Sequence, residues 1–392
     1  MSLIVQKFGG SSVRDAQRIR NVAGIIAETY LEGNDVLVVL SAQGDTTDDL
    51  IAKAEEINSH PSKREMDMLL ATGEQISVAL CAMALESMGL PCVSLTAWQV
   101  GIQTTAVHGD ARIKRIDSER VQAELDQHRI VLITGFQGMD RAGDVTTLGR
   151  GGSDTSAVAL AAAFRAKLCQ IYTDVDGVYT ADPRIVPNAR HLDEITYDEM
   201  LELASQGAGV LHNRSEVLSS LERKPGTKVK EVTKVEKTTI AGVAKDTSIA
   251  RIALIGLRHN PGVAFQVFDL LSKHNINVDL ILQSIGREDS KDISFTVHEK
   301  DLEDARAILT ENQEVLCFDH IEVDGNIGKV SIVGAGLMTN CGMAARMFEA
   351  LYEAGINIQM INTSEIRVSV LLDEGDVDRA VRAIHAKFFD EI

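Results

Sequence analysis

The sequence predicts an α/β protein: an N-terminal, mostly parallel sheet lies between helices, and two smaller ferredoxin-like βαββαβ domains follow it. Three observations support this prediction. In the first half, short apolar runs alternate with stretches of helical periodicity. Around residues 221–250 the chain becomes rich in lysine and glutamate. Toward the C-terminal end, a pattern of strand, glycine, loop, helix and strand occurs twice.

The length, composition and net charge restrict the class of protein to which this chain can belong. The 392 residues carry 39 basic and 57 acidic side chains, a formal net charge of −18. That length is typical of about two to three domains. A hydrophobic fraction of 45% with 24% charged residues indicates a globular rather than a disordered chain. The acidic balance argues against a general nucleic-acid binder but leaves room for one local anion site.

The sequence also indicates a cytoplasmic protein. We expect no transmembrane helix, because no apolar run reaches about 18 residues. The start, MSLIVQKFGG, reads as a strand and a turn rather than a signal peptide. The five cysteines are few and widely spaced, without a CxxC pair, which suits a reducing compartment.

The predicted strands of the first half are near-continuous apolar runs, as expected where helices cover both faces of a sheet. They span 3–8, 35–42, 92–97, 129–136 and 169–175. Helical periodicity marks 14–31, where the apolar positions are Ile19, Val22, Ile25 and Ile26, and the Ala-rich stretch 153–166. A further helix is predicted over 64–88, with Met68, Leu69, Ile76, Leu80, Met83 and Leu85 on its apolar face.

The repeat compares residues 252–284 with residues 330–364, so that Gly256 matches Gly334 and Asn277 matches Asn357. A second strand and helix follow each copy, which gives two β-α-β-β-α units. A short strand within 239–244 could complete one of the sheets. The lysine-rich stretch reads as a solvated connector. The predicted division is 1–228, a connector with a first regulatory strand at 229–250, then 251–325 and 326–392.

Two glycine-rich turns lead from a strand into a helix. In KFGGSSV (7–13), adjacent glycines and a helix start could offer backbone N–H groups to an anion, beside the charge of Lys7. In TTLGRGGSDTSAVAL (146–160), Arg150 could hold a carboxylate or phosphate. Each turn alone could be plain turn or N-cap geometry. Together, at the carboxyl ends of parallel strands, they favour one anion site.

Three further stretches follow strands or open helices. YTDVDGVYTADPR (172–184) fails the calcium-loop pattern, so it is either a loop for a base, ribose or hydrated Mg²⁺, or an Asx-rich turn. SAQGDTTDDL (41–50) and ATGEQIS (71–77) look like ordinary N-caps, although Glu74 would also suit a substrate ammonium group.

These five motifs, in this order and spacing, resemble the aspartate kinase family of the amino acid kinase superfamily, and the paired repeats resemble its tandem ACT domains. The resemblance covers essentially the whole chain. It implies transfer of phosphate from MgATP to the β-carboxylate of L-aspartate, giving 4-phospho-L-aspartate, on the route to lysine, threonine and methionine. The Mg²⁺ would be carried by ATP, without a metal site on the protein. A carboxylate is already a nucleophile, so the reaction needs no general base.

The resemblance also implies roles for individual residues. Lys7 would hold the transferring phosphate and Asp154 would orient Lys7. Glu74 would face the substrate ammonium, Arg150 with Ser153 its α-carboxylate, and Ser41 and Thr47 would line the same region. The expected ATP-binding residues are Lys7, Phe8, Gly9, Gly10, Ser11, Thr173, Asp174, Tyr179, Asp182 and Arg184.

In the family, ACT domains pair across subunits and bind lysine or threonine at their interfaces, so we expect a homodimer through these domains or a larger oligomer. Strand-end hydrogen bonding is the alternative explanation of the Asn-rich strands. The expected effector contacts are Asn260, Pro261, Gly262, Val263, Ala264, Val278, Asp279, Gln283, Asn340, Asn357, Ile358, Asn362, Thr363 and Glu365.

One stretch departs from the family pattern. Relative to the family pattern, roughly a dozen residues are missing between HNRS (212–215) and EVLSS, although a parallel strand pair requires a crossover there. Either the chain lacks a segment of its natural sequence, or the deletion is genuine and puts activity in doubt. The rival functions are another amino acid kinase, which would lack the repeats, and an amino acid sensor without activity, against which Lys7, Arg150 and Asp154 argue.

Overall fold

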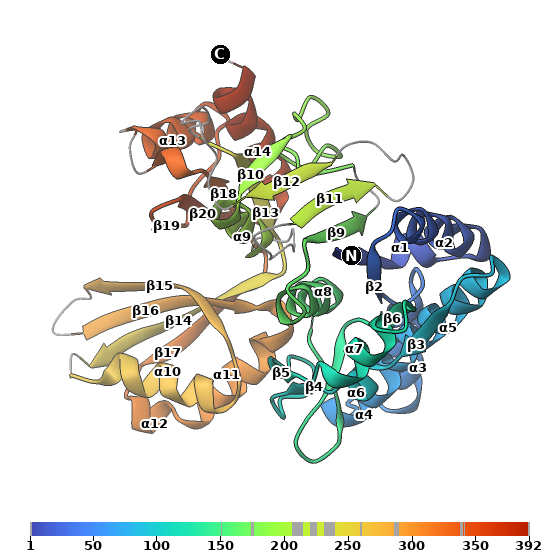
Figure 1. The fold of residues 1–392 in the computed structure, drawn as a ribbon. Helices are drawn as coiled ribbons and strands as arrows, with labels where there is room; N and C mark the ends of the chain where they lie inside the picture. The colour runs from blue at the N-terminus through green and yellow to red at the C-terminus, as the bar shows by residue number, and fades with distance from the viewer. Residues whose placement is uncertain are drawn as a thin grey trace. The chain divides into compact units, whose positions relative to one another are not determined.

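A computed structural model describes residues 2–149, 151–173, 176–205, 215–219, 226–230, 240–258, 261–285, 290–337, 340 and 342–390 (Figure 1). Their contacts divide the chain into two units. The first unit consists of Met1–Tyr179 and His191–Lys234, and the second of Thr180–Arg190 and Val235–Ile392. The predicted α/β fold class is confirmed.

The first unit is built on an eight-stranded sheet with the order β10-β12-β11-β9-β1-β2-β6-β3. From β11 to β3 all neighbours are parallel, whereas β12 runs antiparallel to β11. All five predicted strands are present. The strands are β1 Leu3–Phe8, β2 Asp35–Leu40, β3 Cys92–Leu95, β6 Ile130–Thr134, β9 Leu168–Thr173, β10 Glu194–Thr196, β11 Ser215–Ser219 and β12 Thr227–Lys230.

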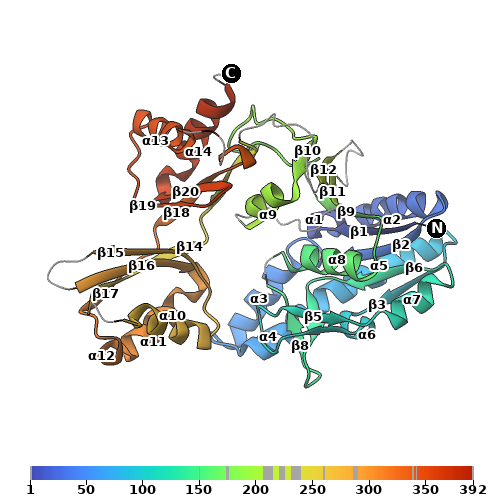
Figure 2. The same cartoon turned by 60° about the vertical axis from the view of Figure 1, so that its left-hand side comes forward.

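Helices cover both faces of this sheet, as can be followed in Figure 2. Side chains of β2 pack alternately: Val36, Val38 and Leu40 join a core with α2 and α5, while Val39 faces the start of α8. The helices are α1 Gly10–Val13, α2 Ala16–Leu31, α3 Thr46–Ile57, α4 Lys63–Leu70, α5 Thr72–Ser87, α6 Ala97–Val100, α7 Glu119–Leu125, α8 Gly152–Ala163 and α9 Tyr197–Ser205.

The predicted helix over 64–88 needs two corrections. It consists of α4 and α5, and most of its predicted apolar face points to solvent, since Met68, Ile76, Leu80 and Met83 are 39–60% exposed. Leu85 is buried as predicted, and the other buried positions include Asp67, Glu74, Val78 and Cys81. By length and composition alone, Lys63–Ser87 could cross a membrane; the buried core helix of a soluble protein passes the same test, and half of its apolar window is buried here.

A second, four-stranded sheet in the first unit, with the order β5-β4-β7-β8, was not predicted. Its strands are only three or four residues long, too short for a readable period of two. They are β4 Ile102–Thr104, β5 Ile113–Ile116, β7 Gln137–Met139 and β8 Val145–Thr147.

Part of the lysine-rich stretch belongs to the first unit's sheet and not to a connector. Its β12 belongs to the large sheet, where Thr227 and Val229 are buried, so the predicted boundary at residue 228 falls inside a strand. The helix α9 lies on the crossover from β9 to β11, which pair in parallel. Residues 206–214, just before the predicted gap after Ser215, are outside the described residues.

The second unit contains two antiparallel four-stranded sheets, as the repeat predicts, with the orders β15-β16-β14-β17 and β13-β18-β20-β19. The predicted extra strand is β13 Gly242–Asp246, which joins the second sheet. The first repeat comprises β14 Ile249–Arg258, α10 Val263–Lys273, β15 Val278–Ile285, β16 Ser290–His298, α11 Leu302–Glu311, α12 Gln313–Leu316 and β17 His320–Asp324. The second comprises β18 Ile327–Val333, α13 Met343–Glu353, β19 Met360–Thr363, β20 Arg367–Asp373 and α14 Val377–His385. One-turn 3₁₀ helices span Glu299–Asp301, Ala335–Leu337 and Glu374–Asp376, and a π-helix spans Ala386–Asp390.

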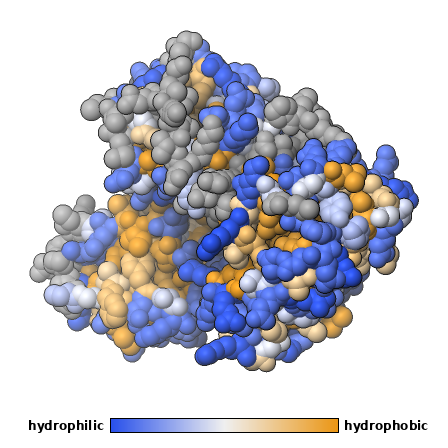
Figure 3. Space-filling view, in the orientation of Figure 1, coloured by the Kyte–Doolittle hydropathy of each residue, from blue (hydrophilic) through white to orange (hydrophobic). Residues whose placement is uncertain are grey.

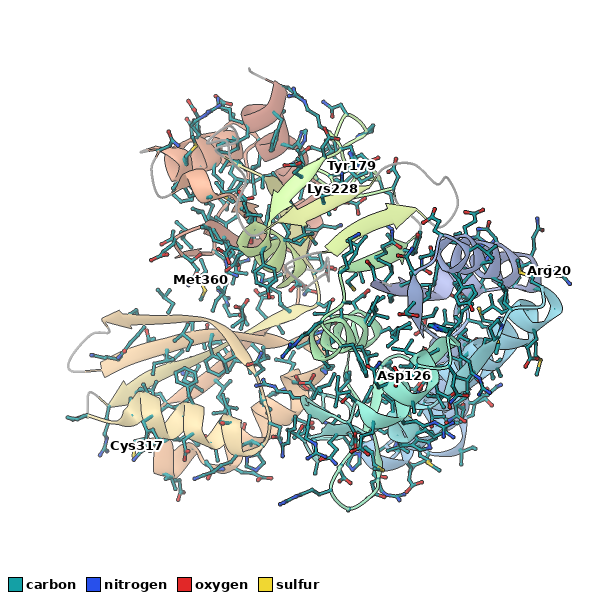
Figure 4. The ribbon with its side chains drawn as sticks, viewed as in Figure 1. Arg20, Asp126, Tyr179, Lys228, Cys317 and Met360 are labelled. Atoms are coloured by element: carbon teal, nitrogen blue, oxygen red, sulfur yellow. The ribbon has the colours of Figure 1, made fainter. Side chains whose placement is uncertain are left out.

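Each repeat has its own apolar core, and a third cluster joins the two sheets. That cluster consists of Ile249, Leu280, Ile327, Leu371 and Met360, the last of which is labelled in Figure 4. The two repeats are therefore packed against each other within this unit.

Candidate functional site

The candidate site of the first unit lies where parallel strands end. β1, β2, β6 and β9 end at Phe8, Leu40, Thr134 and Thr173, and β1 lies between β2 and β9. Strand order reverses at β1, because the chain proceeds from β1 to β2 on one side and returns to β9 on the other. Such a switch point is where open α/β sheets bind ligands.

Lys7 and Asp154 form the centre of this region. The Lys7 Nζ lies 2.9 Å from Oδ1 of Asp154, which stands in the first turn of α8. The lysine is only 8% exposed, so the pair is largely shielded from water. The predicted proximity of these two residues is therefore present in the structure.

The glycine turn after β1 is packed closely against its neighbours. A side chain at Gly10 would place a Cβ 2.7 Å from the carbonyl oxygen of Ala42, so glycine is required there. The N–H of Gly9 already donates to the carbonyl of Tyr172 (3.2 Å) and is not left for a phosphate. The Phe8 ring is fully buried and stacks on Tyr172, so only its backbone can take part in binding. The backbone carbonyl of Ser11 accepts from Arg18 at 2.9 Å.

Glu74 is buried in the first turn of α5, with 3% exposure. Its carboxylate accepts from the N–H of Ala42 (3.1 Å) and from Nε2 of Gln137 (3.3 Å). Burial raises the pKa of Glu74 to about 7, and those hydrogen bonds offset only part of the effect. A carboxyl with this pKa takes up or loses a proton near neutral pH, and a neighbouring cation would favour its charged form.

Ser153 approaches the end of β6. At Gly135, a Cβ would lie 2.7 Å from the Ser153 Oγ, so a glycine there allows α8 to begin close to the sheet. Ser41 follows β2, with its N–H bound to the Phe8 carbonyl at 3.1 Å, and Thr47 is partly buried in the first turn of α3. The structure thus places these residues on loops and helix starts at the same edge of the sheet.

Among the residues predicted to bind ATP, Asp174 lies outside the described residues, as does Arg150 of the substrate set. Thr173 ends β9. Tyr179, labelled in Figure 4, pairs with His191 and donates from its hydroxyl to Asp176 Oδ1 at 2.6 Å.

Asp182 and Arg184 belong to the second unit and bind each other, with Arg184 Nη2 2.7 Å from Asp182 Oδ2. The arginine holds the pKa of Asp182 below its ordinary value. Their segment is fixed by Thr180, whose Oγ1 lies 2.8 Å from Nε2 of the fully buried His385. The Thr180 oxygen also accepts from the N–H of Arg190 at 2.9 Å.

The effector residues predicted in the first repeat are near the start of α10 and on β15. Gly262, with a φ of +93°, caps α10, Pro261 precedes it, and Val263 and Ala264 form its first turn. On β15, Val278 packs against the core, while Asp279 and Gln283 are exposed. Asn260 lies outside the described residues.

In the second repeat, the side chain of Asn340 donates to the carbonyl of Gly336, and Asn357 is exposed ahead of β19. Ile358 packs against the apolar core of this repeat. Asn362 and Thr363 are on the edge strand β19, and Glu365 is exposed in the turn after it.

The sequence analysis missed one ion pair that joins the repeats. Lys329 on β18 is 2% exposed, and its Nζ lies 2.5 Å from Oδ2 of Asp279 on β15 and 3.8 Å from Asp246. Asp279 thus already has a partner inside the unit. A lysine inside the apolar run IGKVSIV was the available signal.

Two further polar residues were missed near the site. Gln137 follows a predicted strand, and Asp67 is the acidic residue inside the apolar stretch MDMLL. Both are buried and hydrogen-bonded, and a polar residue at a buried helix or strand position was their only signal in the sequence.

The family comparisons agree with this geometry. Residues 2–218 match the model of the amino acid kinase family, and residues 252–313 and 330–388 match an ACT domain model. An aspartokinase of Mycolicibacterium smegmatis is 50% identical over 405 residues, covering 99% of this chain and 96% of the relative. One of Bacillus sp. strain MGA3 is 48% identical over 400 residues, covering 99% and 97%. The chain belongs to the aspartate kinase family.

Solved structures support the same assignment. The fold is similar to that of Escherichia coli aspartokinase III in complex with aspartate and ADP, with a TM-score of 0.85, 27% identity and coverage of 99% of this chain and 100% of that one. A Synechocystis aspartate kinase is 43% identical, with a TM-score of 0.53 and coverage of 99% and 69%. This aspartate kinase phosphorylates aspartate, and its ACT domains make it an allosteric enzyme.

The length comparison bears on the predicted gap. The alignment with the Bacillus protein extends over 400 positions although this chain has 392 residues, so that relative has at least eight residues without a counterpart here. A deletion after Ser215 remains a prediction.

Proposed function

We propose that the enzyme transfers the γ-phosphoryl group of MgATP to the β-carboxylate of L-aspartate at the carboxyl ends of β1, β2 and β6. The observation that supports this location is the shielded Lys7–Asp154 pair, 2.9 Å apart. Bringing a carboxylate to a polyphosphate sets two anions against each other. A nearly buried lysine offsets that repulsion and stabilises charge on the transferred group.

In this proposal the site has three parts. Glu74 binds the α-ammonium group, Arg150 with Ser153 binds the α-carboxylate, and Ser41 and Thr47 line the region between them. The backbone of Gly10 and Ser11 faces the phosphates, with Thr173, Asp174, Tyr179, Asp182 and Arg184 around the nucleotide. Asp154 holds the Lys7 ammonium in place, and the aspartate carboxylate attacks the phosphorus without a general base.

The residues around Lys7 fit a Mg²⁺ that arrives with ATP. Asp154, the carboxylate beside Lys7, already forms an ion pair with the Lys7 ammonium. Mg²⁺ is typically held by phosphate oxygens, water and one or two carboxylates rather than by a cage of protein ligands. When bound, the ion neutralises charge on the β- and γ-phosphates.

The Lys7→Ala variant tests the location of the site. We expect it to abolish aspartate-dependent ADP release while leaving the binding of lysine or threonine to the second unit unchanged. Lys53→Ala, an exposed lysine on α3, is the matched control and should retain full activity. Full activity of Lys7→Ala would refute the proposed site, and loss of both activity and effector binding would point to misfolding.

We further propose that lysine, threonine or both inhibit the enzyme at the ACT domains, through the fourteen residues named in the sequence analysis, and that the reaction opens a cytoplasmic route to lysine, threonine and methionine. One lysine-and-aspartate complex of Escherichia coli aspartokinase III supports lysine as an effector (26% identity, TM-score 0.69). An effector inhibits only if it prefers an inactive arrangement. Inhibition assays with each amino acid alone and both together distinguish the effectors.

For assembly, we propose a homodimer through the ACT domains. β15 and β19 are edge strands, and Ile281, Leu282 and Ile361 on them are 45–49% exposed. Figure 3 shows hydrophobic residues gathered where Figure 1 draws β14, β15 and β16. An open strand edge with apolar side chains favours pairing with another chain. Light scattering should give a dimer mass, and Ile281→Asp should shift the protein toward monomer. An unchanged mass would contradict this interface.

A further inference from the structure

Asp67, on α4, is a fully shielded carboxylate outside the substrate-binding set named above. It is 1% exposed and accepts hydrogen bonds from two other segments of the first unit. The Thr147 hydroxyl donates at 2.6 Å, and the Gly109 N–H lies 3.1 Å from both carboxylate oxygens. His108 Nδ1 lies at 2.9 Å, and because a carboxylate oxygen accepts, that nitrogen carries the proton.

The groups that Asp67 holds lead directly to the glycine-rich turn. Thr147 ends β8; Leu148 and Gly149 follow it, and α8, with Ser153 and Asp154 in its first turn, begins at Gly152. The loop held by Asp67 also packs on this turn: a Cβ at Gly149, whose φ is +74°, would lie 2.9 Å from Asp110 Oδ1 and 3.3 Å from the Gly109 carbonyl. Asp67 therefore fixes the turn from two sides.

We propose that Asp67 is a positioning residue for the aspartate subsite: it holds Thr147 and the 108–110 loop, on which Gly149 packs, and so sets the placement of Ser153 at the start of α8, which binds the substrate α-carboxylate. This inference rests on the proposed function, which assigns Arg150 and Ser153 to that carboxylate. Asp67 acts through the turn and does not itself bind substrate.

The choice of a charged residue supports this role. A carboxylate is costly to bury unless its oxygens are satisfied, and an apolar side chain at this helix position would pack without that cost. The carboxylate instead adds directional hydrogen bonds, which hold Thr147 and the 108–110 loop at fixed distances from α4. Small displacements of a substrate-binding group reduce rates strongly, by about 100-fold for about 1 Å.

A cation site is the other use of these side chains that we considered. His108 lies near Asp140 and Asp144, with ligand atoms within 4.8 Å of one another. Arg64 already supplies a positive charge there, since its Nη2 lies 2.6 Å from Asp144 Oδ1. Nothing else in the described residues around this cluster indicates a metal, so the positioning role is the better account of Asp67.

The test is a split between the two substrates. In the full-length enzyme, Asp67→Asn should raise the KM for aspartate about tenfold, with the KM for ATP changed less than about twofold, because only the turn to α8 moves. Thr147→Val should act in the same direction, and Thr147→Ser, which keeps the hydroxyl, should restore the wild-type KM. In the double variant Asp67→Asn/Thr147→Val, the KM for aspartate should rise by less than the product of the two single increases, because both substitutions remove the same Asp67–Thr147 hydrogen bond.

Asp144→Asn is the matched control, because it changes a nearby aspartate that does not contact Asp67, and it should leave both KM values unchanged. Equal changes in both KM values, or a lowered melting temperature with normal KM values, would overturn the proposal. If Asp67→Asn folds poorly, the Thr147 pair carries the test. Full activity of Lys7→Ala would refute the proposed site instead, so the two failures are distinguishable.

Discussion

Glu74→Gln is the perturbation that probes substrate recognition most finely. In the free enzyme, burial raises the pKa of Glu74 to about 7 from its ordinary value near 4.5. Our proposal places the substrate ammonium beside this carboxyl, and a cation there favours the ionised form. Aspartate should therefore bind the ionised enzyme and displace a proton from the protonated one. The glutamine variant has no such proton to release.

The magnitude follows from that pKa. If only the ionised form binds, the apparent dissociation constant of aspartate is multiplied by one plus the ratio of protonated to ionised Glu74. That factor is about 11 at pH 6, about 2 at pH 7 and about 1.1 at pH 8. Affinity should thus rise about tenfold from pH 6 to pH 8 and then level off. At pH 7, about half a proton should be released per aspartate bound.

Calorimetric titrations in two buffers of different ionisation enthalpy measure this proton release directly. The wild type should release about half a proton at pH 7. Glu74→Gln should release none, bind aspartate weakly and lose the pH dependence, whereas Glu86→Gln, at an exposed position on the same helix, should behave as wild type. Equal proton release by the wild type and Glu74→Gln would refute the reasoning.

Stability gives an independent check of the same pKa. The folded chain keeps a proton on Glu74 that the unfolded chain releases above about pH 4.5, so this carboxyl's contribution to stability falls as the pH rises from about 4.5 to about 7. Above pH 7 the loss amounts to about 3 kcal/mol. Without ligands, Glu74→Gln should therefore gain stability relative to the wild type as the pH rises, as measured by urea unfolding.

Two further substitutions test the packing that positions the site and the segment after it. Gly135→Ala would place a methyl group 2.7 Å from the Ser153 Oγ, so it should lower the free energy of unfolding by about 1–3 kcal/mol and raise the KM for aspartate. Gly375→Ala, whose Cβ would have no described atom within 4 Å, is the control and should change neither quantity. A normal KM for Gly135→Ala would contradict the close approach of Gly135 and Ser153. Thr180→Val removes the hydrogen-bond partner of the buried His385 and should lower the free energy of unfolding by about 1–3 kcal/mol, measured with urea. Thr180→Ser keeps the hydroxyl and should retain stability. Equal losses in the two variants would show that the hydroxyl does not stabilise the fold.

The parallel sheet and the two repeats could be predicted because their signals are long. The central strands β2 and β6 contain runs of five and four apolar residues, and the helix containing Ile19, Val22 and Ile26 shows its buried face directly. The strands of the small sheet have three or four residues, too few to show a period. In α4 and α5, apolar residues lie on more than one face, so periodicity alone chose the exposed one.

The site was only partly predictable for a different reason. Lys7, Glu74 and Asp154 adjoin glycine turns or open helices, and such local signals can be read from sequence. Asp67 and Lys329 instead depend on partners 80 and 50 residues away, which no local pattern indicates. Asp182 and Arg184 lie in the same sequence motif as Thr173 and Tyr179, yet their segment packs into the core of the second repeat through Ala181 and Val186. Their closeness along the chain to Thr173 and Tyr179 therefore did not reveal that Asp182 and Arg184 belong to the second unit.

The most direct test of the central claim follows the oxygen atoms of the substrate. L-aspartate labelled with ¹⁸O in its β-carboxylate is incubated with the enzyme and MgATP, and hydroxylamine traps the product. Hydroxylamine attacks the acyl carbon, so the phosphate released keeps the bridging oxygen. We predict phosphate carrying one ¹⁸O atom from the wild type, and none from Lys7→Ala. Unlabelled phosphate from the wild type, or labelled phosphate from Lys7→Ala at the wild-type rate, would contradict a carboxylate attack supported by Lys7.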